Sequence, residues 1–205
     1  IVSQAEYALE HTGDSGEMKD SLETILRQAK RMSRLIAQLL ELARADNGKL
    51  KPEWETVDMT ELCAMVAEEM ELQAETAGLR IVTDLQPDVL ITADQSLLVR
   101  ALTNLVQNAV VYNREGGTVS IGLSLENHVC TVCVKDTGVG IPKEELSMIW
   151  NRFYRASNSM GRSGTGLGLS MVKWILELHR GTVFVESEPD KGTVFTLTLP
   201  ENPRS

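Results

Sequence analysis

The sequence predicts an α+β protein in two parts, a helical segment over residues 1–50 and a mixed α/β domain over residues 51–205. Two patterns indicate this division. Up to residue 46 apolar residues recur every three or four positions, which is typical of bundle helices. From Pro52 onward, helical stretches and strand-like stretches alternate. The composition, 42% hydrophobic and 24% charged, is that of a globular protein.

The first fifty residues indicate part of a helical hairpin. Residues 1–12 have one apolar helical face, residues 12–16 form a polar connector, and a long helix is expected over residues 17–46. The apolar stripe of the long helix consists of Leu22, Ile25, Ala29, Met32, Ile36, Leu39 and Ala43, widened by Leu26, Leu35, Leu40 and Leu42. This width favours a four-helix bundle. Because the long helix measures about 45 Å, we expect most of its antiparallel partner upstream of Ile1.

The remaining residues predict further helices and strands. Helices are expected over residues 59–77, 94–112 and 166–178, and strands over 79–85, 89–92, 118–124, 129–136, 182–187 and 193–199. Asp94 is suited to cap the helix that follows it, because a carboxylate accepts hydrogen bonds from N–H groups of the first turn. The stretch 138–163, rich in Gly, Ser, Asn and Arg, predicts a mobile polar segment.

Charge and cysteine spacing argue against several functions. The net charge is −9 and Lys and Arg are not clustered, so no direct nucleic-acid partner is expected. Cys130 and Cys133 have CxxC spacing, but an offset of three on a strand puts the thiols on opposite faces. No second Cys or His pair completes a zinc site. We therefore expect all three cysteines, Cys63 included, to be buried and structural.

Two polar stretches have residues that could bind a ligand, but neither pattern alone is sufficient evidence of a binding site. Asn104, Asn108 and Tyr112 are four residues apart and share one helical face, but a solvent-facing stripe explains them better when they are taken alone. The stretch DTGVGI (136–141) puts a carboxylate at a strand end, directly before two glycines. Such an Asp can accept a hydrogen bond from an exocyclic amine, although an ordinary tight turn explains it equally well.

A third stretch, GTGLGL (164–169), leads into the last predicted helix. Glycines before a helix expose backbone N–H groups that can bind phosphate. No Gly-Lys-Ser or Gly-Lys-Thr follows, so this is not a Walker loop, and no strand directly precedes it, so it is not a dinucleotide fingerprint.

The order of these motifs resembles the GHKL ATP-binding fold and, within it, the histidine kinases. NLVQNAVVYN (104–113), DTGVGI (136–141), WNRFYR (150–155) and GTGLGL (164–169) are similar to the N, G1, F and G2 boxes of that family, and GTVFTLTLP (192–200) is similar to its closing strand. The resemblance covers about residues 55–200, and the helical segment extends it to residue 1. It implies a two-layer α/β sandwich, with helices on one face of a mixed sheet, and a hairpin that forms a four-helix bundle on dimerisation.

The resemblance also implies roles for individual residues. Asn108, with Asn104 nearby, would bind Mg²⁺, Tyr112 would pack by the adenine, and Asp136 would accept from the adenine amino group. Residues 142–163 would form the ATP lid, and Thr193 would lie near the base. The other implied ATP contacts are Gly138, Gly140, Ile141, Arg152, Tyr154, Arg155, Gly164, Thr165, Gly166, Leu167, Gly168 and Leu169.

The sequence departs from the family pattern at two places. Val111 stands where the family often has a Lys that reaches phosphate, and Arg152, Arg155 and Arg162 are the candidates to supply that charge. His179-Arg180-Gly181 stands where a second glycine is usual.

The three histidines lack the context of the family's phosphate acceptor. That acceptor is followed by Glu or Asp and shortly afterwards by Pro, a pattern absent after His11, His128 and His179. We expect surface or capping roles for all three, and an acceptor upstream of Ile1.

The implied function is that of an ATP-dependent protein histidine kinase in two-component signal transduction. The γ-phosphoryl group of ATP would pass to the upstream histidine and then to an aspartate of a response regulator receiver domain. A second copy, bound through the hairpin, is the other implied partner. The chain would be the cytoplasmic portion of a membrane sensor, and it would contact the membrane only through upstream segments.

Two alternatives remain open. One is another GHKL ATPase, such as a chaperone, a mismatch-repair protein, a topoisomerase or a serine-kinase anti-sigma factor. The heptad hairpin argues against it. The other is a module that senses nucleotide or dimerises without catalysis. Val111 favours it weakly, and the intact glycines of the G1 and G2 boxes argue against it.

Overall fold

The computed structural model describes residues 7, 20–29, 32, 33, 36, 51–159 and 164–203. The chain divides into two compact units, Ile1–Leu50 and Lys51–Ser205. In the first unit every described residue is helical, and the rest of the two predicted helices lies outside the described residues. The described apolar side chains Leu22, Leu26, Met32 and Ile36 are 51–54% exposed. The described part of the long helix thus carries an exposed apolar surface.

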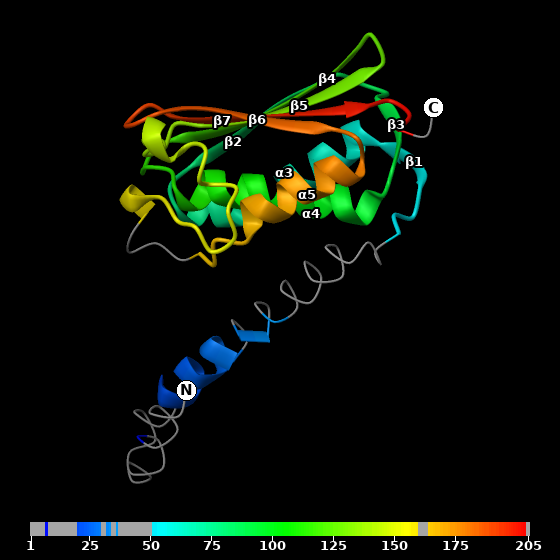
Figure 1. Ribbon diagram of the computed structural model, residues 1–205. Coiled ribbons are helices and arrows are strands. Elements are labelled where there is room, and N and C mark those ends of the chain that lie inside the picture. Colours follow the sequence, from blue (N-terminus) through cyan, green and yellow to red (C-terminus); the bar gives the residue numbers. More distant parts are fainter. Residues whose placement is uncertain are drawn as a thin grey trace. The chain divides into compact units, whose positions relative to one another are not determined.

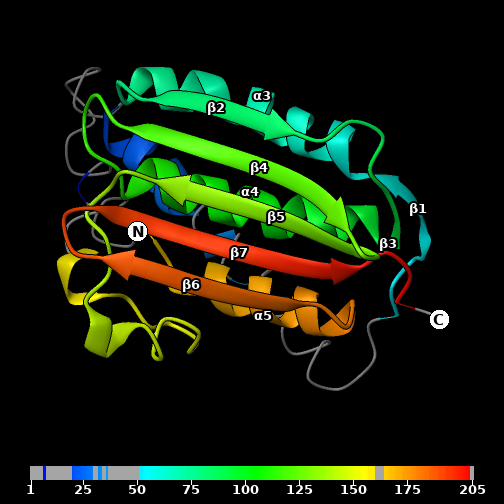
Figure 2. The same cartoon turned by 90° about the horizontal axis from the view of Figure 1, so that it is seen from above.

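The second unit is a two-layer α/β sandwich (Figure 1). Five strands form a mixed sheet in the order β2-β4-β5-β7-β6 (Figure 2). In that order their bounds are Arg80–Leu85, Thr118–Glu126, Val129–Asp136, Gly192–Pro200 and Thr182–Glu188. β2 and β4 run parallel, and the other three pairs are antiparallel. The C-terminal strand β7 therefore lies inside the sheet, between β5 and β6.

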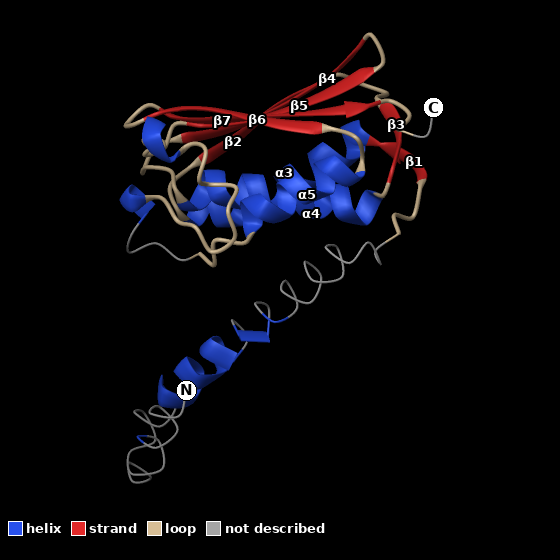
Figure 3. Cartoon of the chain, viewed as in Figure 1, coloured by secondary structure: helices blue, strands red, loops and turns tan. Residues whose placement is uncertain are grey.

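Three helices, α3 (Met59–Thr76), α4 (Gln95–Val111) and α5 (Gly168–Leu178), cover one face of this sheet (Figure 3). Alternate strand residues point toward them and are buried, among them Val119, Ile121, Val132, Val134, Phe195 and Leu197. Within the described residues of this unit no helix covers the opposite face, which is rich in Ser and Thr. The predicted two-layer sandwich with helices on one face is confirmed. No helix among the described residues combines the length and apolarity needed to cross a bilayer.

The starts of the helices follow from their capping residues. The Asp94 carboxylate accepts a hydrogen bond from the backbone N–H of Leu97 at 3.1 Å, so the predicted cap of α4 is confirmed. Helix α5 begins at Gly168, two residues later than expected. The reason is Gly166, whose φ of +72° lies in the left-handed region and cannot continue a right-handed helix.

A small second sheet was not predicted. Strand β1 (Glu55–Asp58) pairs antiparallel with β3 (Leu90–Ala93). Val57 is the one fully buried residue of β1, so the sequence lacks the apolar alternation that marks a strand. Two short 3-10 helices, Lys143–Glu145 and Ser157–Ser159, were also not expected within the stretch 138–163.

The positions of the cysteines and of His128 can be compared with their expected environments. Cys63 and Cys130 are buried as predicted, but Cys133 is only half-buried, because it points to the open face of the sheet. His128 is exposed in the β4–β5 turn, where its Nδ1 lies 2.6 Å from the Glu201 carboxylate. His11 and Arg162 lie outside the described residues.

His179 has a capping role, one of the two roles expected for it, but it does not lie at the surface. It is the C-cap of α5, but only 1% of its side chain is exposed. Its Nδ1 bonds to the Ile175 carbonyl at 2.8 Å, and its Nε2 accepts from the backbone N–H of Asp94 at 3.0 Å. The ring meets Trp54 edge to face, and the Asp94 carboxylate accepts from the Glu53 N–H. This cluster ties the segment entering the domain to the ends of α4 and α5.

Candidate functional site

The N and G1 motifs meet where α4 ends and β5 ends. The backbone N–H of Val139 donates to the carbonyl of Tyr112 at 3.1 Å. A Cβ at Gly138 would lie 2.3 Å from that same carbonyl oxygen. Gly140 has φ +67°, and a Cβ there would lie 2.1 Å from the carbonyl of Glu188. Both glycines are therefore required by close backbone approach, and they keep this turn narrow.

The G2 motif contacts both the F and the N motifs. Phe153 N–H donates to the carbonyl of Gly166 at 2.8 Å, and a Cβ on Gly166 would lie 2.6 Å from the carbonyl carbon of Phe153. A Cβ on Gly168 would lie 3.2 Å from the side-chain oxygen of Asn104. One on Gly164 would lie 2.9 Å from the Tyr112 hydroxyl and 3.9 Å from Nε of Arg155. Motifs separated by up to 64 residues thus line one region.

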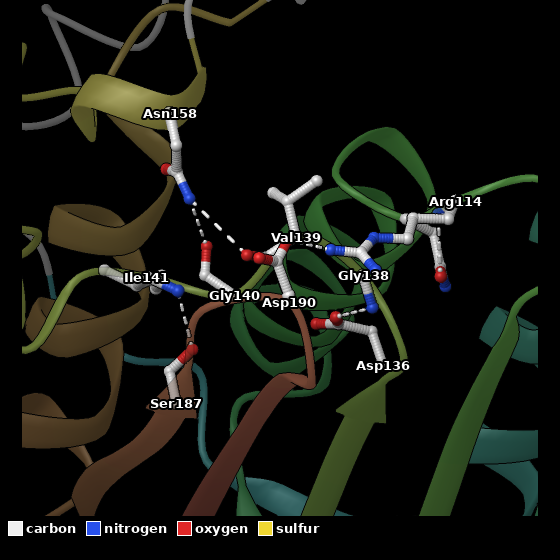
Figure 4. Close-up of polar contacts among 10 residues, drawn as sticks. Arg114, Asp136, Gly138, Val139, Gly140, Ile141, Asn158, Ser187 and Asp190 are labelled. Carbon is white, nitrogen blue, oxygen red and sulfur yellow. Dashed lines mark hydrogen bonds and ion pairs between the residues drawn. The ribbon is translucent and has the colours of Figure 1, made fainter.

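Asp136 has the most unusual electrostatic environment of this region. It is 6% exposed at the end of β5. One carboxylate oxygen, Oδ1, accepts from the N–H groups of Gly138 (2.8 Å, Figure 4) and Thr193 (3.2 Å). The other oxygen, Oδ2, has no hydrogen-bond partner within the described parts of the chain. Burial raises the pKa of this carboxyl to about 6, and the two N–H groups oppose that rise.

The amides of α4 lie on the same side as the glycines. Asn104 and Asn108 are half-buried, and neither amide bonds to any residue that the structure describes. A half-buried amide without a partner is available to a ligand. The first N–H groups of α5, from Gly168 to Ser170, are likewise without partners among residues 51–159 and 164–203, because a helix start offers no acceptors for them.

Other predicted site residues have different surroundings. Leu167 is buried in the core, so only its backbone could reach a ligand, while Thr165 accepts from the Leu167 N–H at 3.3 Å. Tyr154 hydrogen-bonds to the Glu145 carboxylate, and burial is the first cause of its raised pKa. Arg152 and Arg155 are exposed, and Leu169 is half-buried.

Several residues of the site were not predicted. Asn158 donates to the carbonyl of Gly140 at 2.9 Å and so holds part of the stretch 142–159 against the G1 turn (Figure 4). Arg114 pairs with Asp190 of the β6–β7 turn. Ser187 accepts from the Ile141 N–H at 2.8 Å. A signal for Ser187 exists in the sequence, because the inward positions of β6 run Val183, Val185 and then a polar residue.

Comparison with known proteins gives two family matches. Residues 93–203 match the histidine kinase-, DNA gyrase B-, and HSP90-like ATPases, and residues 1–48 match the His Kinase A (phospho-acceptor) domain. The sensor-like histidine kinase SenX3 of Mycobacterium tuberculosis is 34% identical over 198 residues, which are 96% of this chain and 48% of SenX3. The chain spans about half the length of the curated relatives it matches.

Two solved structures of histidine kinases share the fold. Full-length ShkA in complex with AMPPNP has a TM-score of 0.81 at 26% identity, covering 96% of this chain and 42% of ShkA. The histidine kinase ThkA in complex with the response regulator TrrA has a TM-score of 0.78, covering 100% of this chain and 58% of ThkA. At 22% identity the ThkA likeness shows the fold alone.

Proposed function

The chain belongs to the sensor histidine kinases of two-component systems, and from this membership we propose that it binds ATP with Mg²⁺ and transfers the γ-phosphoryl group to a histidine. The observation that carries the proposal is Asp136, a buried carboxylate with one oxygen unpartnered among the described residues, beside backbone that glycines leave open. The match of residues 1–48 to the phospho-acceptor domain favours this function over that of a gyrase-like or HSP90-like ATPase.

The base is proposed to bind at Asp136. Its free oxygen Oδ2 would accept a hydrogen bond from the adenine amino group, whereas a carbonyl at the same place would be repelled. Tyr112 and Thr193 flank this position, since Tyr112 contacts the G1 turn and the Thr193 N–H bonds to Asp136. Gly138, Gly140 and Ile141 form the wall of the proposed base site.

The phosphates are proposed to bind at the start of α5. The helix dipole favours an anion there, as do the first N–H groups of α5, which have no partners among the described residues. Gly164 and Gly166 let the backbone approach the anion. Val111 cannot supply the positive charge that its family position often carries. We assign that role to Arg155, because its guanidinium lies beside Gly164.

The metal is proposed to bind the amide oxygen of Asn108, with Asn104 one turn away. The residues fit Mg²⁺, which prefers oxygen ligands and is commonly held by few protein groups, phosphates and water. When bound, the ion would offset phosphate charge during transfer. The role of the protein is to hold the Asn108 amide in a fixed orientation on helix α4.

The partners follow from the same membership. A second copy would cover the exposed stripe of Leu22, Leu26, Met32 and Ile36, as a four-helix bundle requires. A histidine outside this sequence is the proposed acceptor, because His179 is buried in a structural role and His11 and His128 lack the acceptor pattern. The phosphoryl group would pass to a response regulator, the kind of partner present in the ThkA complex. We place the chain on the cytoplasmic side of a membrane sensor.

The metal assignment is tested by replacing Asn108 with alanine. Asn108→Ala should lose Mg²⁺-dependent ATP binding in calorimetric titration while its unfolding curve stays that of the unsubstituted protein. Gln107→Ala is the matched control, since it removes an exposed amide from the same helix and should leave ATP binding unchanged. If Asn108→Ala binds ATP with the affinity of the unsubstituted protein in the presence of Mg²⁺, the metal assignment is wrong.

Catalysis needs its own test. Incubated with labelled ATP and Mg²⁺, the chain should transfer label to a separately made hairpin that contains the upstream helix. A phosphohistidine is acid-labile and base-stable. ATP binding without any transfer would favour the non-catalytic module that Val111 allows.

A further inference from the structure

Three inward-facing polar residues lie side by side at one end of the sheet. Ser187 of β6 is paired with Thr193 of β7, and Lys135 of β5 is paired with Val194, so Asp136 comes next to Thr193. The hydroxyl oxygens of Ser187 and Thr193 are 2.9 Å apart. Ser187 Oγ is also 2.9 Å from the carbonyl oxygen of Gly192 and 2.8 Å from the N–H nitrogen of Ile141. Ser187 therefore has three hydrogen-bond partners.

The chemistry of the partners fixes the direction of each bond. A hydroxyl has one proton and two lone pairs. The Gly192 carbonyl can only accept, so the Ser187 proton points to it. The Ile141 N–H can only donate, so it takes one lone pair. The contact between the two hydroxyls is then a hydrogen bond only if Thr193 donates to the remaining lone pair of Ser187.

Thr193 consequently presents only lone pairs to everything else. Its proton is held by Ser187, so a group that contacts its oxygen from another side must donate. A base amino group or a bridging water can do so, and a base carbonyl cannot. Beside it, Asp136 Oδ2 is also an acceptor at neutral pH. The two oxygens form a pair of acceptors at the end of neighbouring strands.

We propose that Ser187 is a specificity-positioning residue: by fixing the Thr193 hydroxyl as an acceptor, it makes the site select a purine with an amino group at C6 over one with a carbonyl there. The inference rests on the proposed function, in which the base lies at Asp136 and Thr193. It goes beyond that function because it assigns selectivity between purine bases to Ser187, a residue that need not contact the nucleotide. It also explains why a serine stands where β6 otherwise has valine.

The test compares ATP with ITP. ATP has an amino group at C6, whereas ITP has a carbonyl at C6 and a proton on the neighbouring N1. Ser187→Ala frees the Thr193 hydroxyl to rotate and donate to the carbonyl. We expect the Kd ratio of ITP to ATP to fall by about three- to tenfold, the effect of one hydrogen bond. Ser187→Thr keeps a hydroxyl with the same proton and lone pairs, so it should recover the ratio that Ser187→Ala loses.

Two further variants separate positioning from general damage. Thr182→Val removes another hydroxyl contact between β6 and β7, the 2.7 Å pair with Thr198, far along the strands from Asp136. It should leave the ratio unchanged. In a Thr193→Val background Ser187→Ala should have no further effect on the ratio, because the hydroxyl it orients is gone. A purely structural Ser187 would instead weaken ATP and ITP equally.

Each outcome of these measurements supports or contradicts the role of Ser187. If Ser187→Ala folds and keeps the ratio of the unsubstituted protein, the inference is wrong. If Ser187→Ala does not fold, Thr193→Val decides alone, since it removes one of the two acceptors and must also lower the ratio; an unchanged ratio overturns the inference. Equal binding of ATP and ITP by the unsubstituted protein, or no binding of either, overturns the proposed base site itself. Discrimination that Asp136→Ala abolishes and Ser187→Ala leaves intact refutes only the role of Ser187.

Discussion

Replacing Asp136 with asparagine should make the protein more stable while weakening its binding of ATP. Burial raises the pKa of this carboxyl from 3.8 to about 6. The folded protein therefore holds the neutral form more readily than the unfolded chain does. Each tenfold change in an ionisation constant corresponds to about 1.4 kcal/mol, so the buried charge costs about 3 kcal/mol at pH 7.

Asparagine avoids this cost and keeps the local geometry. Its side-chain oxygen can still accept from the N–H groups of Gly138 and Thr193. The expected gain in the free energy of unfolding at pH 7 is up to about 3 kcal/mol. The amide nitrogen would point where the free carboxylate oxygen was. Because it donates rather than accepts, ATP affinity should fall at least about tenfold.

The pH dependence gives a second measure of the same effect. Between about pH 4 and pH 6 the folded state binds more protons at Asp136 than the unfolded state does, so the stability of the unsubstituted protein falls as pH rises through this window. The difference between the unsubstituted protein and Asp136→Asn isolates that slope in urea titrations at several pH values. ATP affinity should rise through the same window only where Asp136 is present. A less stable variant at pH 7, or a flat difference curve, would refute the reasoning.

Two further predictions concern the framework of the site. Gly166→Ala and Gly116→Ala both force a side chain into the left-handed region, at φ +72° and +75°, but only the former adds a clash, with Phe153. Urea titration should show a loss of about 1–2 kcal/mol for Gly116→Ala and a larger one for Gly166→Ala, and only Gly166→Ala should weaken ATP binding. His179→Ala should cost about 2–4 kcal/mol, because it leaves the Asp94 N–H unpartnered. Burial lowers the pKa of His179, so part of the stability of the unsubstituted protein should be lost as pH falls below about 6.5, a loss absent from His179→Ala.

The sequence predicted those features that depend on neighbouring residues. The alternation of β4, β5 and β7, the cap at Asp94 and the glycine motifs all act locally, and the order of the motifs indicated the family. Residues that depend on pairing were missed. Ser187 acquires a role only when β6 is placed in register with β7, and β1 becomes a strand only because β3 lies beside it. The burial of His179 likewise depends on Trp54, which is 125 positions away in the chain.

The central position of β7 links the order of synthesis to the order of assembly. Of the strands, β7 leaves the ribosome last, yet it bonds to both β5 and β6. Until it arrives, β6 has no neighbour in the sheet and β5 presents an open edge of the kind that pairs with other chains. Thr193 arrives with the same strand, so a nascent chain cannot acquire the complete proposed base site before β7 is made. A chain whose synthesis stops shortly before residue 192 would therefore be prone to aggregate. Nucleotide binding could not stabilise it, because the proposed base site would be incomplete.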